Sequence, residues 1–235
     1  MRVYGPKRKQ VYKQGGKGKL RKYKTQAKSM YPSIGAVKPL GNVKKVTHRY
    51  CQGARTINPG LGSVAAAHYF SANGLYDPDI TGVGHQPVGF DQMSPFFQKY
   101  TVIGATITVD FENINAGDTH MIVGIAVQDD AVFNGDIERV IENGNMIYTT
   151  IGSSDGGDNH RRLTYNINPN TFLGIKNPMS DDRVKGTDAT NPNEQVYFAV
   201  FAGPNRSAVD ADVVRILVTI DYTCVWHEPN NLAKS

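Results

Sequence analysis

The first third of this 235-residue sequence lacks acidic residues altogether. No Asp or Glu occurs before Asp77, although 16 of the 26 Lys and Arg residues lie in that stretch. The other 10 share residues 77–235 with all 21 acids, so the formal net charge of +5 hides two parts of opposite sign. This asymmetry excludes the evenly mixed surface charge of an ordinary soluble enzyme and points to a polyanionic partner.

Cysteines and long apolar runs are also scarce. Cys51 and Cys224 are too few for a disulfide scaffold and match no zinc-ligand spacing. No apolar run reaches the roughly 18 residues of a membrane-spanning helix, and no apolar segment of a secretory signal follows the basic N-terminus. We therefore expect a soluble protein made in the cytosol, with reduced thiols and no membrane insertion.

Catalytic and metal-binding motifs are missing as well. The six histidines form no H-E-x-x-H pair, and the glycine-rich stretches at 82–84 and 152–157 lack the Lys-Ser/Thr of a phosphate-binding loop. We predict no enzymatic activity, no cofactor and no metal. Carboxylate groups leave calcium open as an alternative, although turns held by side-chain hydrogen bonds explain Asp77 and Asp79 better. The candidate carboxylates are Asp77, Asp79, Asp91, Asp129, Asp130, Asp181 and Asp182.

Residues 1–45 form a basic, glycine-containing segment that cannot bury enough apolar surface to order itself, so we expect a disordered arm. Its cations alternate with tyrosines, which suits single-stranded nucleic acid because cations follow phosphates while aromatic rings stack on bases. The cluster Lys7, Arg8 and Lys9 also fits a nuclear-import signal. The predicted nucleic-acid-binding residues are Arg2, Tyr4, Lys7, Arg8, Lys9, Tyr12, Lys13, Lys17, Lys19, Arg21, Lys22, Tyr23, Lys24, Lys28, Arg49 and Arg55.

From Val46 onward the sequence alternates apolar and polar residues. Residues 213–226 place seven apolar side chains from Val214 to Trp226 on one face, and residues 102–114 place Ile103, Ala105, Ile107, Val109 and Phe111 together. Further strands are predicted near 46–55, 64–72, 119–128, 145–151, 160–167 and 194–202.

Two short helical turns are predicted between these strands. Ser94 and Pro95 favour a helix start that would continue to Tyr100, and the apolar spacing after Asp136 favours a turn that ends at Asn143 and Gly144.

Eight alternating strands joined by long loops rich in Pro, Gly, Asn and Asp predict an all-β fold, a single eight-stranded jelly roll of two four-stranded antiparallel sheets over residues 46–235. Because the first and last strands of a jelly roll are neighbours, Cys51 and Cys224 should lie in one sheet. Their alternation with neighbouring residues places them on opposite faces.

The run from Phe70 to Phe111 resembles the capsid proteins of circovirus-like viruses, which have circular single-stranded DNA genomes and encode their own replication initiator. The matching motifs are N-G-L-Y-D-P-D at residues 73–79, G-H-Q-P-V-G-F-D-Q at 84–92 and Y-T-V-I-G-A-T-I at 100–107. Arg161 to Tyr165 and Asn168-Pro169 resemble the segment of that group before its final strands.

This resemblance implies a viral coat protein of a virion. It implies an icosahedral shell of about sixty copies around a single-stranded DNA genome, assembled in the host cell nucleus after contact with the import machinery. The arm would hang inward onto the packaged phosphates, and Arg49 and Arg55 would extend its basic surface onto the inner wall. Surface loops would carry subunit contacts and meet a receptor that the sequence does not identify.

Two other classes of function stay open at this point. A lectin-like jelly-roll binding module could hold an acidic glycan or nucleic acid with the basic arm. A metal-dependent nuclease would degrade DNA in a chelator-sensitive way.

Overall fold

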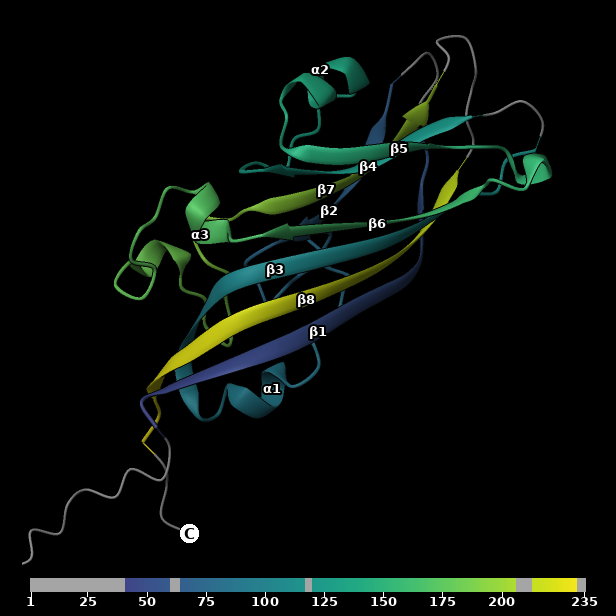
Figure 1. Cartoon of the computed structure of the whole chain (residues 1–235). Coiled ribbons are helices and arrows are strands. Elements are labelled where there is room, and N and C mark those ends of the chain that lie inside the picture. The colour runs from purple at the N-terminus through teal and green to yellow at the C-terminus, as the bar shows by residue number, and fades with distance from the viewer. Residues whose placement is uncertain (1–40, 60–63, 117–119, 206–212, 232–235) are drawn as a thin grey trace, which may run out of the picture. The chain divides into compact units, whose positions relative to one another are not determined.

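The computed structural model describes residues 41–59, 64–116, 120–205 and 213–231. Contacts divide the chain into Met1–Lys38, which lies outside the described residues, and Pro39–Ser235. The described part of the second unit contains eight strands in two four-stranded sheets, ordered β1-β8-β3-β6 and β2-β7-β4-β5 (Figure 1). The strands are β1 (Val43–Ile57), β2 (Ala66–Ser71), β3 (Phe97–Asn113), β4 (Met121–Gln128), β5 (Met146–Ile151), β6 (His160–Ile167), β7 (Tyr197–Pro204) and β8 (Val214–Pro229).

Every strand pair is antiparallel, and of strands adjacent in sequence only β4 and β5 pair with each other. Each of the other connections passes from one sheet to the other, and the first and last strands lie side by side. This strand order confirms the predicted jelly roll. The first strand begins at Val43, three residues before the predicted domain boundary.

The apolar face of β8 lies in the core as predicted, with all seven of its side chains buried from Val214 to Trp226. The prediction for β3 was wrong at one residue. A β-bulge between Val102 and Gly104 reverses the alternation there, so Tyr100 and Val102 are buried and Ile103 is not.

Strand β7 is apolar on both faces because both faces are covered. Phe198 and Val200 belong to the core between the sheets, whereas Ala199 and Phe201 belong to a smaller cluster on the outward face of the second sheet. Gly124 on the neighbouring strand leaves room for the Phe201 ring, since a Cβ there would lie 2.5 Å from it.

The predicted helical turn after Asp136 is confirmed as α2 (Ile137–Glu142), and the Asp136 side chain caps it by accepting hydrogen bonds from two backbone amides. The predicted turn from Ser94 to Tyr100 was wrong. A shorter helix, α1 (Phe90–Met93), ends at Ser94, and Phe97 already starts β3 because its side chain enters the core. The remaining turns are α3 (Pro169–Phe172), η1 (Ser154–Gly156) and η2 (Asp182–Val184).

The two cysteines lie on adjacent strands and opposite faces, as predicted. Cys51 is exposed on β1, Cys224 is buried on β8, and both are free thiols. Burial raises the pKa of the Cys224 thiol to about 12. None of the helices in the described ranges is long and apolar enough to cross a membrane.

Candidate functional site

Of the predicted nucleic-acid-binding residues, only Arg49 and Arg55 lie within the described residues. The others, from Arg2 to Lys28, lie outside them, and so does the proposed import signal at Lys7, Arg8 and Lys9. For these positions, nucleic-acid binding and nuclear targeting stay predictions.

Arg49 projects from the outward face of the β1-β8-β3-β6 sheet. Its Nε and one terminal nitrogen donate to the two carboxylate oxygens of Asp221 on β8, at 2.6 and 2.7 Å. This two-point pair satisfies the arginine fork and neutralises its charge. A phosphate would have to compete with Asp221 for this guanidinium.

Arg55 occupies the opposite face of the same strand. The pairing of β1 with β8 shifts register between Gln52 and Arg55, so the alternation reverses and Arg55 stands opposite the buried Ile216. Its guanidinium donates to Asp79 at 2.9 Å. The expectation that Arg49 and Arg55 share one basic surface was therefore wrong.

The rest of the outward face repeats the pairing seen at Arg49. Arg162 on β6 makes two bonds to Asp110 on β3, at 2.7 and 2.9 Å, and Arg215 on β8 donates to Glu112 at 2.9 Å. Cross-strand pairs of opposite charge alternate with threonines along this face. The result is a polar, charge-balanced surface rather than a basic one.

Two lysines at the start of β1 differ from these arginines. Lys44 and Lys45 are exposed, and among the described residues neither has an ion-pair partner. These two unpaired lysines are the last residues of the predicted arm, and the structure places them in the first strand.

The most buried charge of the described chain is Asp79, whose side chain is 0% exposed. It accepts hydrogen bonds from Arg55 at 2.9 Å, from the Thr81 hydroxyl at 2.8 Å and from the Thr81 amide at 3.2 Å, and it lies 3.0 Å from His68 Nε2. Burial alone would raise the pKa of Asp79, but the Thr81 hydrogen bonds and the charges of His68 and Arg55 hold that pKa below its usual value.

This cluster joins β1, β2 and the segment between β2 and α1. The aromatic neighbours complete it: His85 stacks on Tyr50 with ring centroids 4.8 Å apart, and the Tyr50 hydroxyl donates to Gln52 at 2.6 Å. A hydrolytic triad needs a histidine between its nucleophile and its carboxylate, but here the Thr81 hydroxyl donates directly to the carboxylate that His68 contacts. The Asp79 cluster instead connects β1 and β2 to the segment between β2 and α1.

A second set of hydrogen bonds, through His48, holds the segment between β2 and α1 close to the start of α1. The Trp226 indole donates to His48 Nε2 at 2.9 Å, so His48 carries its proton on Nδ1, 3.0 Å from the Val88 carbonyl oxygen. Burial lowers the pKa of His48, and the Val88 hydrogen bond offsets this only in part.

A third contact fixes the turn at residues 75–77. The Tyr100 hydroxyl accepts from the Leu75 amide at 2.9 Å, and the Asn191 side chain bonds the backbone of Tyr76 and Asp77. Hydrogen bonds through Asp79, His48 and Tyr100 therefore attach residues 73–92 to the sandwich.

The carboxylates considered for calcium mostly have cationic or amide partners. Asp181 pairs with Arg183 at 2.8 Å, Asp182 pairs with Lys185 at 2.8 Å, and Asp130 accepts from Gln128 at 3.2 Å. Among the described residues, no three His, Cys, Asp or Glu side chains gather closely enough to hold a metal ion.

Sequence reasoning missed the convergence of Arg55, His68 and Asp79. In the sequence, only Asp79 hinted at this cluster, and an aspartate that follows a proline fits a turn equally well. The bulge that turns Arg55 inward lies between Gln52 and Arg55 and contains Gly53, and this glycine within the strand is the sequence signal that could have marked it.

No family model matches the chain, and no curated protein matches it. Solved structures with similar coordinates are viral by title. They include Desmodium yellow mottle tymovirus, with 14% identity, a TM-score of 0.40, and coverage of 88% of this chain and 100% of that one.

Two others are a semi-empty virus-like particle of a nodavirus of the giant freshwater prawn Macrobrachium rosenbergii and the mud crab tombus-like virus. Their identities are 9% and 10%, and their TM-scores are 0.47 and 0.48. The first match covers 88% of this chain and 94% of that one, and the second covers 86% and 96%. The assignment of the fold itself rests on the strand order described above.

Proposed function

We propose that this chain is the coat protein of a virus, that about sixty copies close into an icosahedral shell, and that its basic N-terminal segment packages single-stranded DNA. The observation that carries the proposal is an acid-free segment with 12 Lys and Arg residues before the first strand of an eight-stranded jelly roll. Jelly rolls of this strand number are common in viral capsids. The resemblance of residues 70–111 to circovirus-like coat proteins supports the single-stranded DNA genome.

The charge distribution over the sandwich supports a division of labour. On the outward face of the β1-β8-β3-β6 sheet, three arginines are each paired with a carboxylate, which leaves little free cationic charge for phosphate. The segment before β1 has 11 Lys and Arg residues up to Lys28 and no acid to neutralise them. DNA binding then belongs to that segment, and assembly belongs to the sandwich.

Deleting residues 1–40 tests the packaging step. Particles of the shortened chain should form but contain far less DNA, measured by absorbance ratio and by extraction from nuclease-treated particles. DNA binding by the full chain should weaken steeply with salt, because each neutralised phosphate releases a counterion. Unchanged DNA content after the deletion would overturn the role of this segment.

Two variants, one that removes charge and one that removes aromatic rings, separate phosphate contact from base stacking. Replacing the 11 Lys and Arg residues up to Lys28 by Gln should abolish packaging. Replacing Tyr4, Tyr12 and Tyr23 by Ser should weaken single-strand binding while leaving the salt dependence unchanged.

Nuclear entry is tested with Lys7, Arg8 and Lys9 replaced by Ala in a fluorescent fusion, which should remain outside the nucleus.

A further inference from the structure

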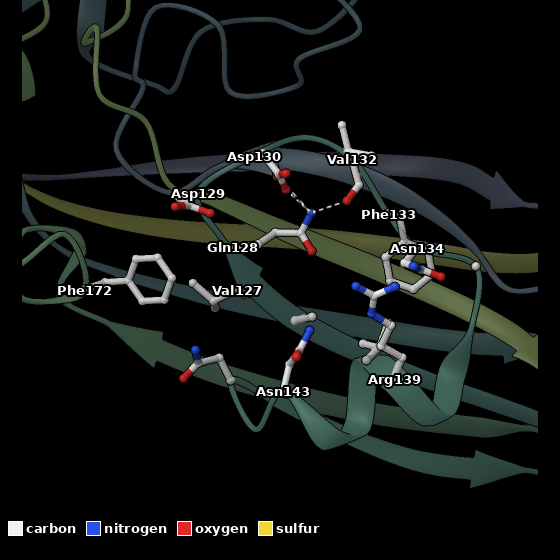
Figure 2. A pocket seen from close by; sticks show the side chains of 14 residues that line it. Val127, Gln128, Asp129, Asp130, Val132, Phe133, Asn134, Arg139, Asn143 and Phe172 are labelled. Atoms are coloured by element: carbon white, nitrogen blue, oxygen red, sulfur yellow. Dashed lines mark hydrogen bonds between the residues drawn. The ribbon is translucent and has the colours of Figure 1, made fainter.

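A cavity of about 810 Å³ lies on the outward side of the β2-β7-β4-β5 sheet, apart from the clusters described above. The end of β4, the segment from Asp129 to Gly135, helix α2 and Phe172 of α3 enclose it (Figure 2). Its volume falls within the range of small-ligand sites, roughly 300 to 1,000 Å³.

The walls of this cavity are fixed by contacts within the chain. Gln128 Nε2 donates to the Asp130 carbonyl at 2.8 Å and to the Val132 carbonyl at 3.0 Å, which holds the turn that forms one rim. Phe133 stacks on Phe201 with centroids 5.5 Å apart, and the Asp136 cap fixes the start of α2. A ligand would therefore enter a preformed site and bear little of the cost of ordering it.

Arg139 distinguishes the cavity because it is the one described arginine without a carboxylate partner. Its guanidinium points toward Phe133 and Asn134 (Figure 2), and among the described residues it has no carboxylate partner. Arg49, Arg162 and Arg215, by contrast, each bind a carboxylate. Five donors in a fixed fork are thus available to an acceptor from outside the chain, and both carboxylate and phosphate groups match the geometry of that fork.

The remaining lining suits a sugar ring better than other anions. The side-chain amides of Asn143 and Asn145 each carry an acceptor oxygen and a donor nitrogen, so hydroxyl groups find both donors and acceptors. Phe133, which lies beside Arg139, offers an apolar ring face to the C–H side of a pyranose, whereas Phe172 lines the far end of the cavity (Figure 2). Asp129 and Asp130 repel anions in proportion to their charge, so a polyphosphate or a nucleic acid is disfavoured more strongly than a ligand with a single carboxylate. Asp129 can also accept a hydrogen bond from a sugar hydroxyl.

We propose that this cavity binds a sugar that bears one carboxylate, with the carboxylate on Arg139 and the ring against Phe133. The site is built entirely from the folded sandwich, so it goes beyond the proposed packaging function and depends on neither DNA nor shell closure. In a shell it would give each subunit one glycan-binding site.

Saturation-transfer NMR on the full chain tests the proposal, with the methyl α-glycoside of N-acetylneuraminic acid as probe and methyl β-galactoside as its neutral counterpart. We expect saturable binding of the acidic sugar only. Arg139→Ala should weaken binding at least about tenfold, because hydrogen bonds to a charged group are the strong ones. Phe133→Leu, which keeps the apolar contact with Phe201 but removes the ring, should weaken binding less.

The arm adds a complication, since its cations attract any carboxylate. The matched control is Arg161→Ala, which removes an exposed cation outside the cavity and leaves the arm intact, and the titrations are run at about the ionic strength of serum, where such exposed charges are screened. Binding that is lost in Arg139→Ala and kept in Arg161→Ala supports the site. Equal binding by both variants, equal binding of the neutral sugar, or no saturable binding by the full chain overturns it.

Discussion

The two sheets of the sandwich share one core but present different outward faces. The β1-β8-β3-β6 sheet turns a bare polar face outward, where arginines pair with carboxylates across strands. The outward face of the β2-β7-β4-β5 sheet carries a second apolar cluster, over which α2 and the segment at 129–136 enclose a cavity. Other parts of the chain thus cover the outward face of one sheet, whereas the outward face of the other sheet is exposed to solvent.

The comparison explains why β8 and β7 look so different in sequence. Strand β8 alternates because water meets one of its faces, whereas β7 is apolar throughout because protein covers both. The lesson is that a continuous apolar strand signals a covering element, even in an antiparallel sheet.

Truncating an outward side chain on each sheet should give very different costs. Phe201 is fully buried between β7 and its cover, so Phe201→Ala should destabilise the unassembled subunit by about 4 kcal/mol. Leu217 on β8 is 43% exposed, and Leu217→Ala should change stability by less than about 0.5 kcal/mol. Urea unfolding measures both. Equal costs would mean that the two faces are equally covered.

The buried ion pair at Asp79 should contribute more to the free energy of unfolding than the exposed pair at Asp221. Asp79→Asn leaves Arg55 and His68 without their buried partner, and we expect a loss of about 3 kcal/mol, at the low end for a buried pair because Arg55 keeps some solvent contact. Asp221→Asn removes the exposed partner of Arg49 and should cost less than about 1 kcal/mol. Chemical denaturation of both variants at neutral pH gives the difference directly.

A smaller effect should appear on acidification. Burial lowers the pKa of His48 and of His227, so the unfolded chain binds protons more readily than the folded chain. Stability should be constant above about pH 6.5, the ordinary value for histidine, and should fall as the pH drops below it. The loss per group cannot exceed about 1.4 kcal/mol per pH unit.

His48→Gln identifies the group responsible, with His160→Gln as the control because His160 is exposed. The first variant should be less stable at neutral pH and less sensitive to acid, since it has one fewer suppressed proton. The second should follow the parent chain. A parent chain whose unfolding midpoint does not change from about pH 7 to pH 5 would contradict the assignment of a neutral, buried His48.

Much of the fold could be predicted from the sequence because alternation is a direct record of which face is buried. All seven inward residues of β8 and the turn after Asp136 follow from local pattern alone. The bulges at Gln52–Arg55 and Val102–Gly104 do not follow from alternation, because an extra residue changes the facing of its neighbours. The glycine at each of them, Gly53 and Gly104, is the local signal that a bulge leaves in a strand. Those bulges are why Arg55 and Ile103 were placed on the wrong side.

The site was harder to predict for a related reason. Asp79, His68 and Arg55 lie on three separate segments, and only the fold brings them together. The cavity beneath α2 also depends on long-range packing, since Phe172 and Arg139 come from different helices. Charge, by contrast, needs no fold to be seen, and the acid-free segment is the feature that the sequence displays most plainly.

The most direct test of the central claim is negative-stain microscopy of the purified full chain, paired with sedimentation. The capsid proposal predicts uniform closed particles with about sixty times the 25.8 kDa mass of one chain. A solution containing only monomers or small oligomers, under conditions where the subunit is folded and at high concentration, would contradict it and favour a jelly-roll binding module instead.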